Sequence, residues 1–151
     1  MEKICCFAGH SKIFGEEEIY KRLLETIEGL IINEKYREFW VGNYGAFDRT
    51  SARAVRELKK KYPEIKLTLV IPYLTAEINK YKEEYYKNFD SIIAATIPEN
   101  TPPKAHIIKC NQFMVERAEC LVCFVEHSWG GAAKTLEYAQ KKDLKIINFA
   151  D

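Results

Sequence analysis

The sequence lacks the features of membrane-spanning, disordered and collagen-like chains. No apolar run approaches the roughly 18 residues that a membrane-spanning helix needs. Glycine and proline are scarce, with 7 and 5 residues among 151, whereas collagen-like chains are rich in both. Apolar residues make up 47% of the chain and aromatic residues 13%, which is enough to bury a core. We therefore expect one globular domain over residues 1–151, without a membrane partner.

The chain also lacks an excess of either charge. Its 23 lysines and arginines face 22 acidic residues, for a net charge of +1. Proteins that bind nucleic acid usually carry a basic patch or stripe. The simplest interpretation of the lysine runs at 59–61 and 141–142 is that they are solvated helix ends. We do not expect nucleic acid as a partner.

The sequence shows neither the pattern of a secretory signal peptide nor that of a disulfide framework. Only about five apolar residues precede Gly9, too few for a signal-peptide core, so we expect a cytoplasmic protein. The five cysteines are an odd number, and most of them fall inside apolar runs, as expected for reduced, packed thiols: Cys5, Cys6, Cys120 and Cys123.

Apolar runs of strand length alternate with segments of helical period along the chain. The runs predict strands over residues 4–8, 38–41, 67–71, 92–95, 121–125 and 146–149. Helical spacing predicts helices over residues 19–31, 52–62, 77–88, 107–118 and 132–142. Strands that are apolar on both faces and joined by helices indicate a doubly wound, three-layer α/β fold with a parallel sheet. Ligands bind such sheets beyond the carboxyl ends of the strands.

The loop at residues 42–48 follows one of these strands and is rich in glycine. Gly42 and Gly45 would let the backbone approach a ligand closely, and the free amides at the start of the next helix suit a phosphate. The alternative is a tight turn with Asp48 as the helix N-cap. The loop is neither a Walker A motif nor a Gly-x-Gly-x-x-Gly fingerprint.

A second glycine loop begins at Trp129 and also leads from a strand into a helix. Gly130 and Gly131 could hold a phosphate while Thr135 donates its hydroxyl from the first helical turn. Ala133 stands where a Walker A motif requires glycine. A flexible turn before a helix is the alternative.

The sequence contains only weak patterns for a metal site or for a catalytic cysteine. Cys120 and Cys123 are three apart in a strand and face opposite sides of the sheet, so they cannot share a zinc ion. We expect neither a metal nor a cofactor. A histidine near a loop could meet the thiol of Cys110, but such residues are commonly surface or capping residues. The candidates are His10, His106 and His127.

Five segments occur in an order that resembles a known family. They are Cys6-Phe7-Ala8-Gly9-His10, Gly42-x-x-Gly45-x-x-Asp48, Tyr62-Pro63-x-Ile65-Lys66-Leu67, Asn111-x-x-Met114-Val115-x-Arg117 and Gly130-Gly131-x-x-x-Thr135-x-x-Tyr138-Ala139. Together they resemble the small bacterial and phage SLOG-domain proteins related to YpsA, in the superfamily of Smf/DprA and the Lonely Guy phosphoribohydrolases. The resemblance implies a Rossmann-like domain that binds nucleotides or nucleotide-derived ligands.

The chain departs from its relatives at several positions. Asn43 replaces a second glycine, and Ser11 and Cys110 stand where arginine is usual, so two anion contacts are missing. In the hydrolytic branch of the superfamily, a glutamate is implicated in cleaving the N-glycosidic bond. Tyr138 stands at the matching position of this chain. Glu137 is adjacent, but on a helix it points about 100° away.

The favoured hypothesis is a binding protein for a nucleotide or a nucleotide-derived ligand, in sensing or sequestration. Its expected ligand-binding residues are Gly9, His10, Ser11, Gly42, Asn43, Gly45, Ala46, Asp48, Asn111, Arg117, Gly130, Gly131 and Thr135. The alternative is a nucleoside-monophosphate phosphoribohydrolase that uses Glu137 or another carboxylate as base and Arg117 to hold phosphate. DNA binding as in the Smf/DprA branch would need a basic stripe.

An aromatic cluster in the helix expected over 77–88 suggests self-association. Tyr81, Tyr85, Tyr86 and Phe89 have spacings that place them on one helix face. Aromatic residues are enriched at protein interfaces, although they also pack cores. With the family resemblance, they lead us to expect a homodimer.

Overall fold

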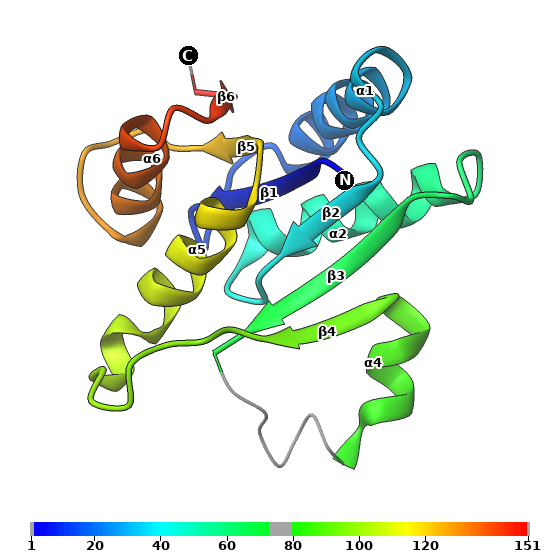
Figure 1. Ribbon diagram of the computed structural model, residues 1–151. Coiled ribbons are helices and arrows are strands. Elements are labelled where there is room, and N and C mark those ends of the chain that lie inside the picture. Colours follow the sequence, from blue (N-terminus) through cyan, green and yellow to red (C-terminus); the bar gives the residue numbers. More distant parts are fainter. Residues whose placement is uncertain (1, 73–79, 151) are drawn as a thin grey trace.

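Six parallel strands form one sheet in the computed structural model, which describes residues 2–72 and 80–150 (Figure 1). The strands are β1 (Ile4–Gly9), β2 (Glu38–Val41), β3 (Lys66–Ile71), β4 (Ser91–Ala94), β5 (Cys120–Phe124) and β6 (Lys145–Asn148). Their order across the sheet is β4-β3-β2-β1-β5-β6, and every neighbouring pair is parallel. The predicted doubly wound α/β fold is confirmed.

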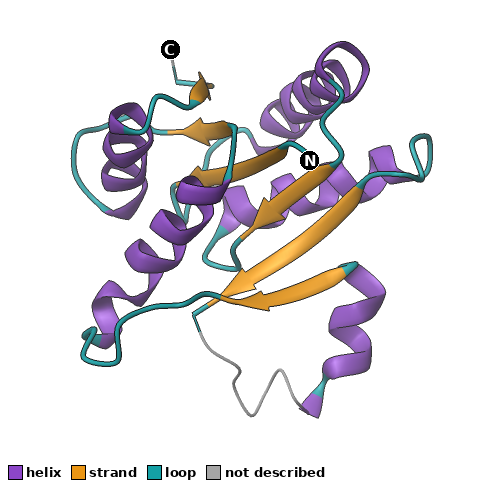
Figure 2. Cartoon of the chain, in the orientation of Figure 1, coloured by secondary structure: helices purple, strands orange, loops and turns teal. Residues whose placement is uncertain are grey.

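Helices cover both faces of this sheet (Figure 2). One face carries α1 (Glu16–Glu34), α2 (Ala46–Lys59) and α4 (Lys82–Asn88), and the other carries α5 (His106–Arg117) and α6 (Gly131–Lys141). A short 3-10 turn, η1 (Pro103–Ala105), leads into α5. Residues 77–79 of the helix expected over 77–88 lie outside the described residues. Among the helices that are described, none is long and apolar enough to cross a membrane.

The apolar runs are explained by two cores, one on each face of the sheet. Along β1, Cys5 and Phe7 belong to the core under α1 and α2, whereas Cys6 and Ala8 belong to the core under α5 and α6. All five thiols are buried and free. Cys120 and Cys123 fall in opposite cores, as their spacing in a strand predicts.

The strand order places a switch point at the centre of the sheet. From β1 the chain passes to β2 on one side, while β5 lies on the other side of β1. The loops that follow β1 and β5 therefore lead to helices on opposite faces, α1 and α6. Doubly wound sheets bind their ligands in the crevice that this divergence opens.

Helix α2 begins earlier than its apolar spacing indicated. Its first residue is Ala46 and its N-cap is Gly45, which has no side chain to act as a cap. Asp48 is the third residue of the helix, so the alternative that made Asp48 the N-cap is wrong. The Asp48 carboxylate instead reaches back to accept a hydrogen bond from the backbone N–H of Tyr44, at 3.0 Å.

The aromatic residues around α4 divide between core and surface. Tyr85 and Phe89 pack against the core under α1 and α2. Tyr81 and Tyr86 remain 42% and 46% exposed. Of the single aromatic face expected from their spacing, only Tyr81 and Tyr86 are therefore exposed to a partner.

Candidate functional site

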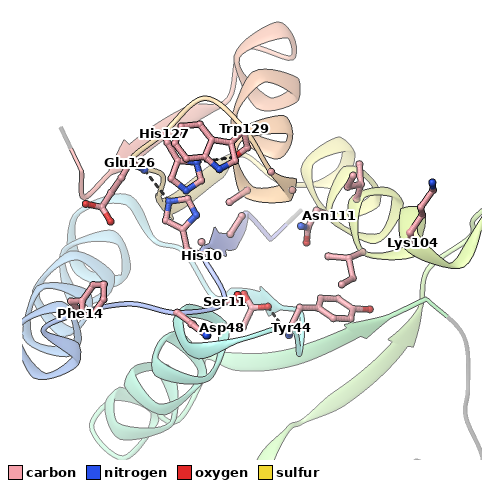
Figure 3. Close-up of a pocket in the computed structure, with 18 residues that line it drawn as sticks. His10, Ser11, Phe14, Tyr44, Asp48, Lys104, Asn111, Glu126, His127 and Trp129 are labelled. Atoms are coloured by element: carbon pink, nitrogen blue, oxygen red, sulfur yellow. Dashed lines mark hydrogen bonds between the residues drawn. The ribbon is translucent and has the colours of Figure 1, made fainter.

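A cavity of about 660 Å³ opens at the switch point, beyond the carboxyl ends of β1 and β5 (Figure 3). Four segments line it: the end of β1 and its loop, the start of α2, the start of α5, and the loop from β5 into α6. Their side chains and backbone come from Ala8, Gly9, His10, Ser11, Lys12, Phe14, Tyr44, Asp48, Lys104, Ile107, Ile108, Asn111, Glu126, His127, Trp129, Gly130, Gly131 and Ala132.

Three aromatic rings form one wall of this cavity. His10 stacks on His127 with ring centroids 4.2 Å apart and planes at 18°. His127 stacks in turn on Trp129, at 3.8 Å and 14°. Figure 3 shows the three rings in succession from His10 to Trp129. We call this series the ring stack.

A hydrogen bond from a backbone amide to the His10 ring fixes the inner end of the ring stack. The N–H of Glu126 donates to Nε2 of His10 at 3.0 Å, which joins the loop after β1 to the loop after β5. An accepting Nε2 carries no proton. Burial lowers the pKa of His10, and His127 lowers it further. Both effects favour the neutral imidazole that this bond requires.

Asp48 is the buried carboxylate of the cavity. It is 8% exposed, and burial raises its pKa to about 6, while the hydrogen bond from Tyr44 acts in the opposite direction. Asn111 on α5 lines the same cavity and is also 8% exposed. The two side chains can accept and donate hydrogen bonds to a polar ligand.

The N-terminus of α6 also faces the cavity. Its N-cap is Gly130, with φ at 93°, a region that L-residues with side chains rarely adopt. A Cβ on Gly130 would meet only a carbon of His127, at 4.0 Å, so the backbone conformation explains this glycine. Helix N-termini attract anions through their exposed N–H groups.

Two predicted glycines serve contacts inside the protein. A Cβ on Gly9 would lie 2.4 Å from the ring of Phe47, which is fully buried against β1. A Cβ on Gly45 would lie 2.4 Å from Cα of Ser11. The N–H of Ala46 donates to the carbonyl of Ser11 at 2.8 Å, so this amide holds another loop.

The structure brings about half of the predicted ligand residues together. Seven of them line the cavity: Gly9, His10, Ser11, Asp48, Asn111, Gly130 and Gly131. Gly42 and Asn43 instead line a separate cavity of about 330 Å³, which also reaches Asp48. Gly45 and Ala46 line neither of these cavities.

Arg117 and Thr135 are turned to other partners. The guanidinium of Arg117 donates to the carbonyl of Phe113 at 3.0 Å and lies 3.6 Å from the centroid of that ring. The buried hydroxyl of Thr135 donates to the carbonyl of Gly131 at 2.9 Å. Neither residue lines the cavity.

Tyr138, Glu137 and Cys110 lie outside the cavity, whereas two of the histidines named as possible partners of Cys110, His10 and His127, line it. Tyr138 on α6 donates its hydroxyl to the Glu116 carboxylate at 2.6 Å, and Glu137 is not among the lining residues. The Cys110 thiol donates to the carbonyl of Val70 at 3.6 Å, and burial raises its pKa to about 11. Asp48 and Glu126 are the carboxylates that line the cavity.

Sequence reasoning missed much of the cavity wall. Phe14, Trp129 and Ile107 all line the cavity and remain 94%, 69% and 41% exposed. Each stands in a loop or at a helix start that a doubly wound sheet brings to its carboxyl edge. Large apolar side chains in such segments are the signal that could have identified them, because loops seldom need them for packing.

One family model matches the chain, that of the YspA SLOG family, over residues 10–150. A UPF0398 protein of Bacillus cereus is 29% identical over 106 residues, which cover 66% of this chain and 56% of that protein. The SPbeta prophage-derived protein YoqJ of Bacillus subtilis is 28% identical over 136 residues, with 80% and 79% coverage. The chain thus spans little more than half of the UPF0398 protein that it matches.

Solved structures of low sequence identity share the fold. DNA processing protein A (DprA) of Streptococcus pneumoniae matches with a TM-score of 0.70 and 15% identity, over 97% of this chain and 50% of that one. DprA of Helicobacter pylori, solved for its single-stranded DNA binding mode, gives 0.66 and 11%, over 97% and 64%. The molybdenum cofactor carrier protein of Chlamydomonas reinhardtii gives 0.61 and 13%, over 99% and 78%.

Proposed function

The chain belongs to the YspA SLOG family, and from this membership we propose that it binds a nucleotide or nucleotide-derived ligand in the cavity between β1 and β5. One observation carries the proposal: an aromatic wall, a helix N-terminus and buried polar groups all face one cavity at the switch point. Its volume of about 660 Å³ lies within the range of small-molecule sites. The role is sensing or sequestration of the ligand.

The polar groups of the cavity suit different parts of a nucleotide. The N-terminus of α6 at Gly130 and Gly131 fits a phosphate. Lys12 and Lys104 add positive charge to the lining. Asp48 and Asn111 offer hydrogen-bonding groups for ribose hydroxyls.

A thermal-shift panel tests this proposal. The panel holds AMP, ADP, ADP-ribose, NAD and cyclic dinucleotides. A ligand at about 100 times its Kd adds roughly 2.7 kcal/mol to the free energy of unfolding, a rise of about 5 to 10 °C in Tm for a domain of this size. We expect such a rise with at least one compound, and no response to any of them overturns the proposal.

Single-stranded DNA is the competing ligand class that this panel must separate. The likeness to DprA is one of fold, at 15% and 11% identity. A short oligothymidylate added as a further sample gives the comparison, because it presents bases and phosphates in a flexible single strand and not as a free nucleotide. A response to the oligonucleotide alone would move the proposal from nucleotide sensing to DNA binding.

The homodimer is a further prediction for this protein. The exposed rings of Tyr81 and Tyr86 provide apolar surface near β4, an edge strand of the sheet. We expect light scattering at micromolar concentration to give twice the chain mass of 17.6 kDa. A mass of 17.6 kDa at the same concentration contradicts this prediction.

A further inference from the structure

The ring stack is held at one end and open at the other. At the inner end, His10 meets the ring of Phe124 edge-on, with centroids 6.3 Å apart, and accepts the N–H of Glu126. At the outer end, Trp129 is 69% exposed although one of its faces is covered by His127. In the described part of the chain, no ring covers the second face of the indole.

The outer end is set for another flat ring. His127 is fixed beneath the indole because its Nδ1 lies 2.9 Å from the carbonyl oxygen of Trp129, which can only accept a hydrogen bond. His127 therefore supports one face of the indole and leaves the other face open. Nucleobases stack on aromatic side chains through their π-faces, whereas sugars and phosphates offer no such face.

The surroundings of Trp129 also favour an apolar face at the cavity mouth. Phe14 and Ile107 line the same cavity and are 94% and 41% exposed. The deeper lining contains the polar side chains of Asp48 and Asn111, both 8% exposed. This distribution matches a ligand with a flat, weakly polar end outside and a polar end inside.

We propose that the nucleobase of the ligand stacks on the outer face of Trp129, as the next ring after His10, His127 and Trp129. This inference rests on the proposed function and adds the position of the base. Trp129 directly precedes Gly130 and Gly131, so a base on the indole keeps the rest of the nucleotide beside the N-terminus of α6. Trp129 is thus the residue that selects ligands with an aromatic base.

Calorimetry with two probes tests the inference. AMP carries a base, and ribose 5-phosphate carries the same sugar phosphate without one. Trp129→Ala is expected to weaken AMP binding roughly 5- to 150-fold, the range measured for lost base stacking. Ribose 5-phosphate binding is expected to change by less than about twofold, and Trp129→Phe to lose less AMP affinity than Trp129→Ala because a ring remains.

A matched control removes an exposed ring elsewhere. Tyr86→Ala truncates an aromatic side chain that is 46% exposed on α4 and lines no part of the site cavity. We expect it to bind AMP as the wild type does. Circular dichroism of each variant shows whether the fold is retained.

Fluorescence gives an independent measurement because the chain has only two tryptophans. Trp40 is 8% exposed and stacks on Phe113 within the core under α5 and α6. Stacking of AMP on Trp129 is expected to quench the emission of the wild type. The quenching should vanish in Trp129→Phe, which retains Trp40.

The outcomes separate the two proposals. AMP that binds Trp129→Ala as tightly as the wild type, or binds the wild type without quenching, overturns the stacking inference and leaves the proposed function standing. An equal loss of AMP and ribose 5-phosphate binding also overturns it, since Trp129 would then only support the loop. If no nucleotide binds the wild type, both proposals fail.

Discussion

Gly45→Val is expected to lower the free energy of unfolding by more than about 3 kcal/mol. Gly45 has φ at 146° and ψ at −170°, a conformation that costs a β-branched residue about 1 to 3 kcal/mol. The new Cβ would also lie 2.4 Å from Cα of Ser11, where the obstacle is backbone and cannot rotate away. Strain and overlap therefore act together.

Urea denaturation of the wild type and the variant measures this effect, and Gly15→Ala is the matched control. Gly15 also has a positive φ, at 68°, but a Cβ there would meet nothing within 4 Å. The control should therefore show the cost of the backbone conformation alone, about 1 kcal/mol. A Gly45→Val midpoint equal to that of Gly15→Ala would show that the loop after β1 moves aside.

Asp48→Asn is expected to stabilise the protein at neutral pH by up to about 3 kcal/mol. Burial raises the pKa of Asp48 to about 6 in the folded state, against about 3.9 in an unfolded chain. The folded protein therefore binds more protons than the unfolded chain between pH 4 and 6, and wild-type stability falls as the pH rises through this window. Asparagine is neutral at every pH and avoids this loss.

The measurement is the free energy of unfolding from pH 3.5 to 8. The difference between Asp48→Asn and the wild type should be small near pH 4, grow up to about pH 6 and then level off. Glu126→Gln is the control, because it removes an exposed carboxylate from the same cavity, where water screens the charge. A constant difference at all pH values would mean that ionised Asp48 is not penalised in the fold.

The raised pKa of Asp48 is compatible with its place in the proposed site. A carboxylate that costs stability when ionised is typical of a binding or active site. Asp48→Asn keeps an oxygen that can accept the N–H of Tyr44 but removes the negative charge. The same variant in the nucleotide panel thus separates a charge-dependent ligand contact from a structural role.

The sheet could be predicted from the sequence because its signals are local. Cys5, Cys6, Phe7 and Ala8 form an unbroken apolar run, and a strand with helices on both faces requires such a run. The glycines after the strands likewise indicated the edge of the sheet at which the cavity opens. Those signals depend only on residues that are adjacent in the chain.

The cavity wall could not be predicted because it joins distant residues. His10 and His127 come from loops that meet only when β1 pairs with β5, and neither loop alone indicates a ring stack. Gly45 met the local criteria for a ligand contact, but a Cβ at this position would point at the backbone of Ser11, which comes from another loop. Arg117 was expected on the resemblance, yet its guanidinium lies on Phe113, a contact that sequence spacing cannot reveal.

The loops at the carboxyl edge are joined in series. Ala46 at the start of α2 holds Ser11, and the neighbouring His10 holds Glu126, which leads into α6. The bond to the His10 side chain depends on the residue at that position, so a loop from a relative without this histidine would leave the N–H of Glu126 without its partner. Loop grafts between members of this family therefore need to transfer the loop after β1 together with the loop after β5, and we expect coordinated changes in these two loops among relatives.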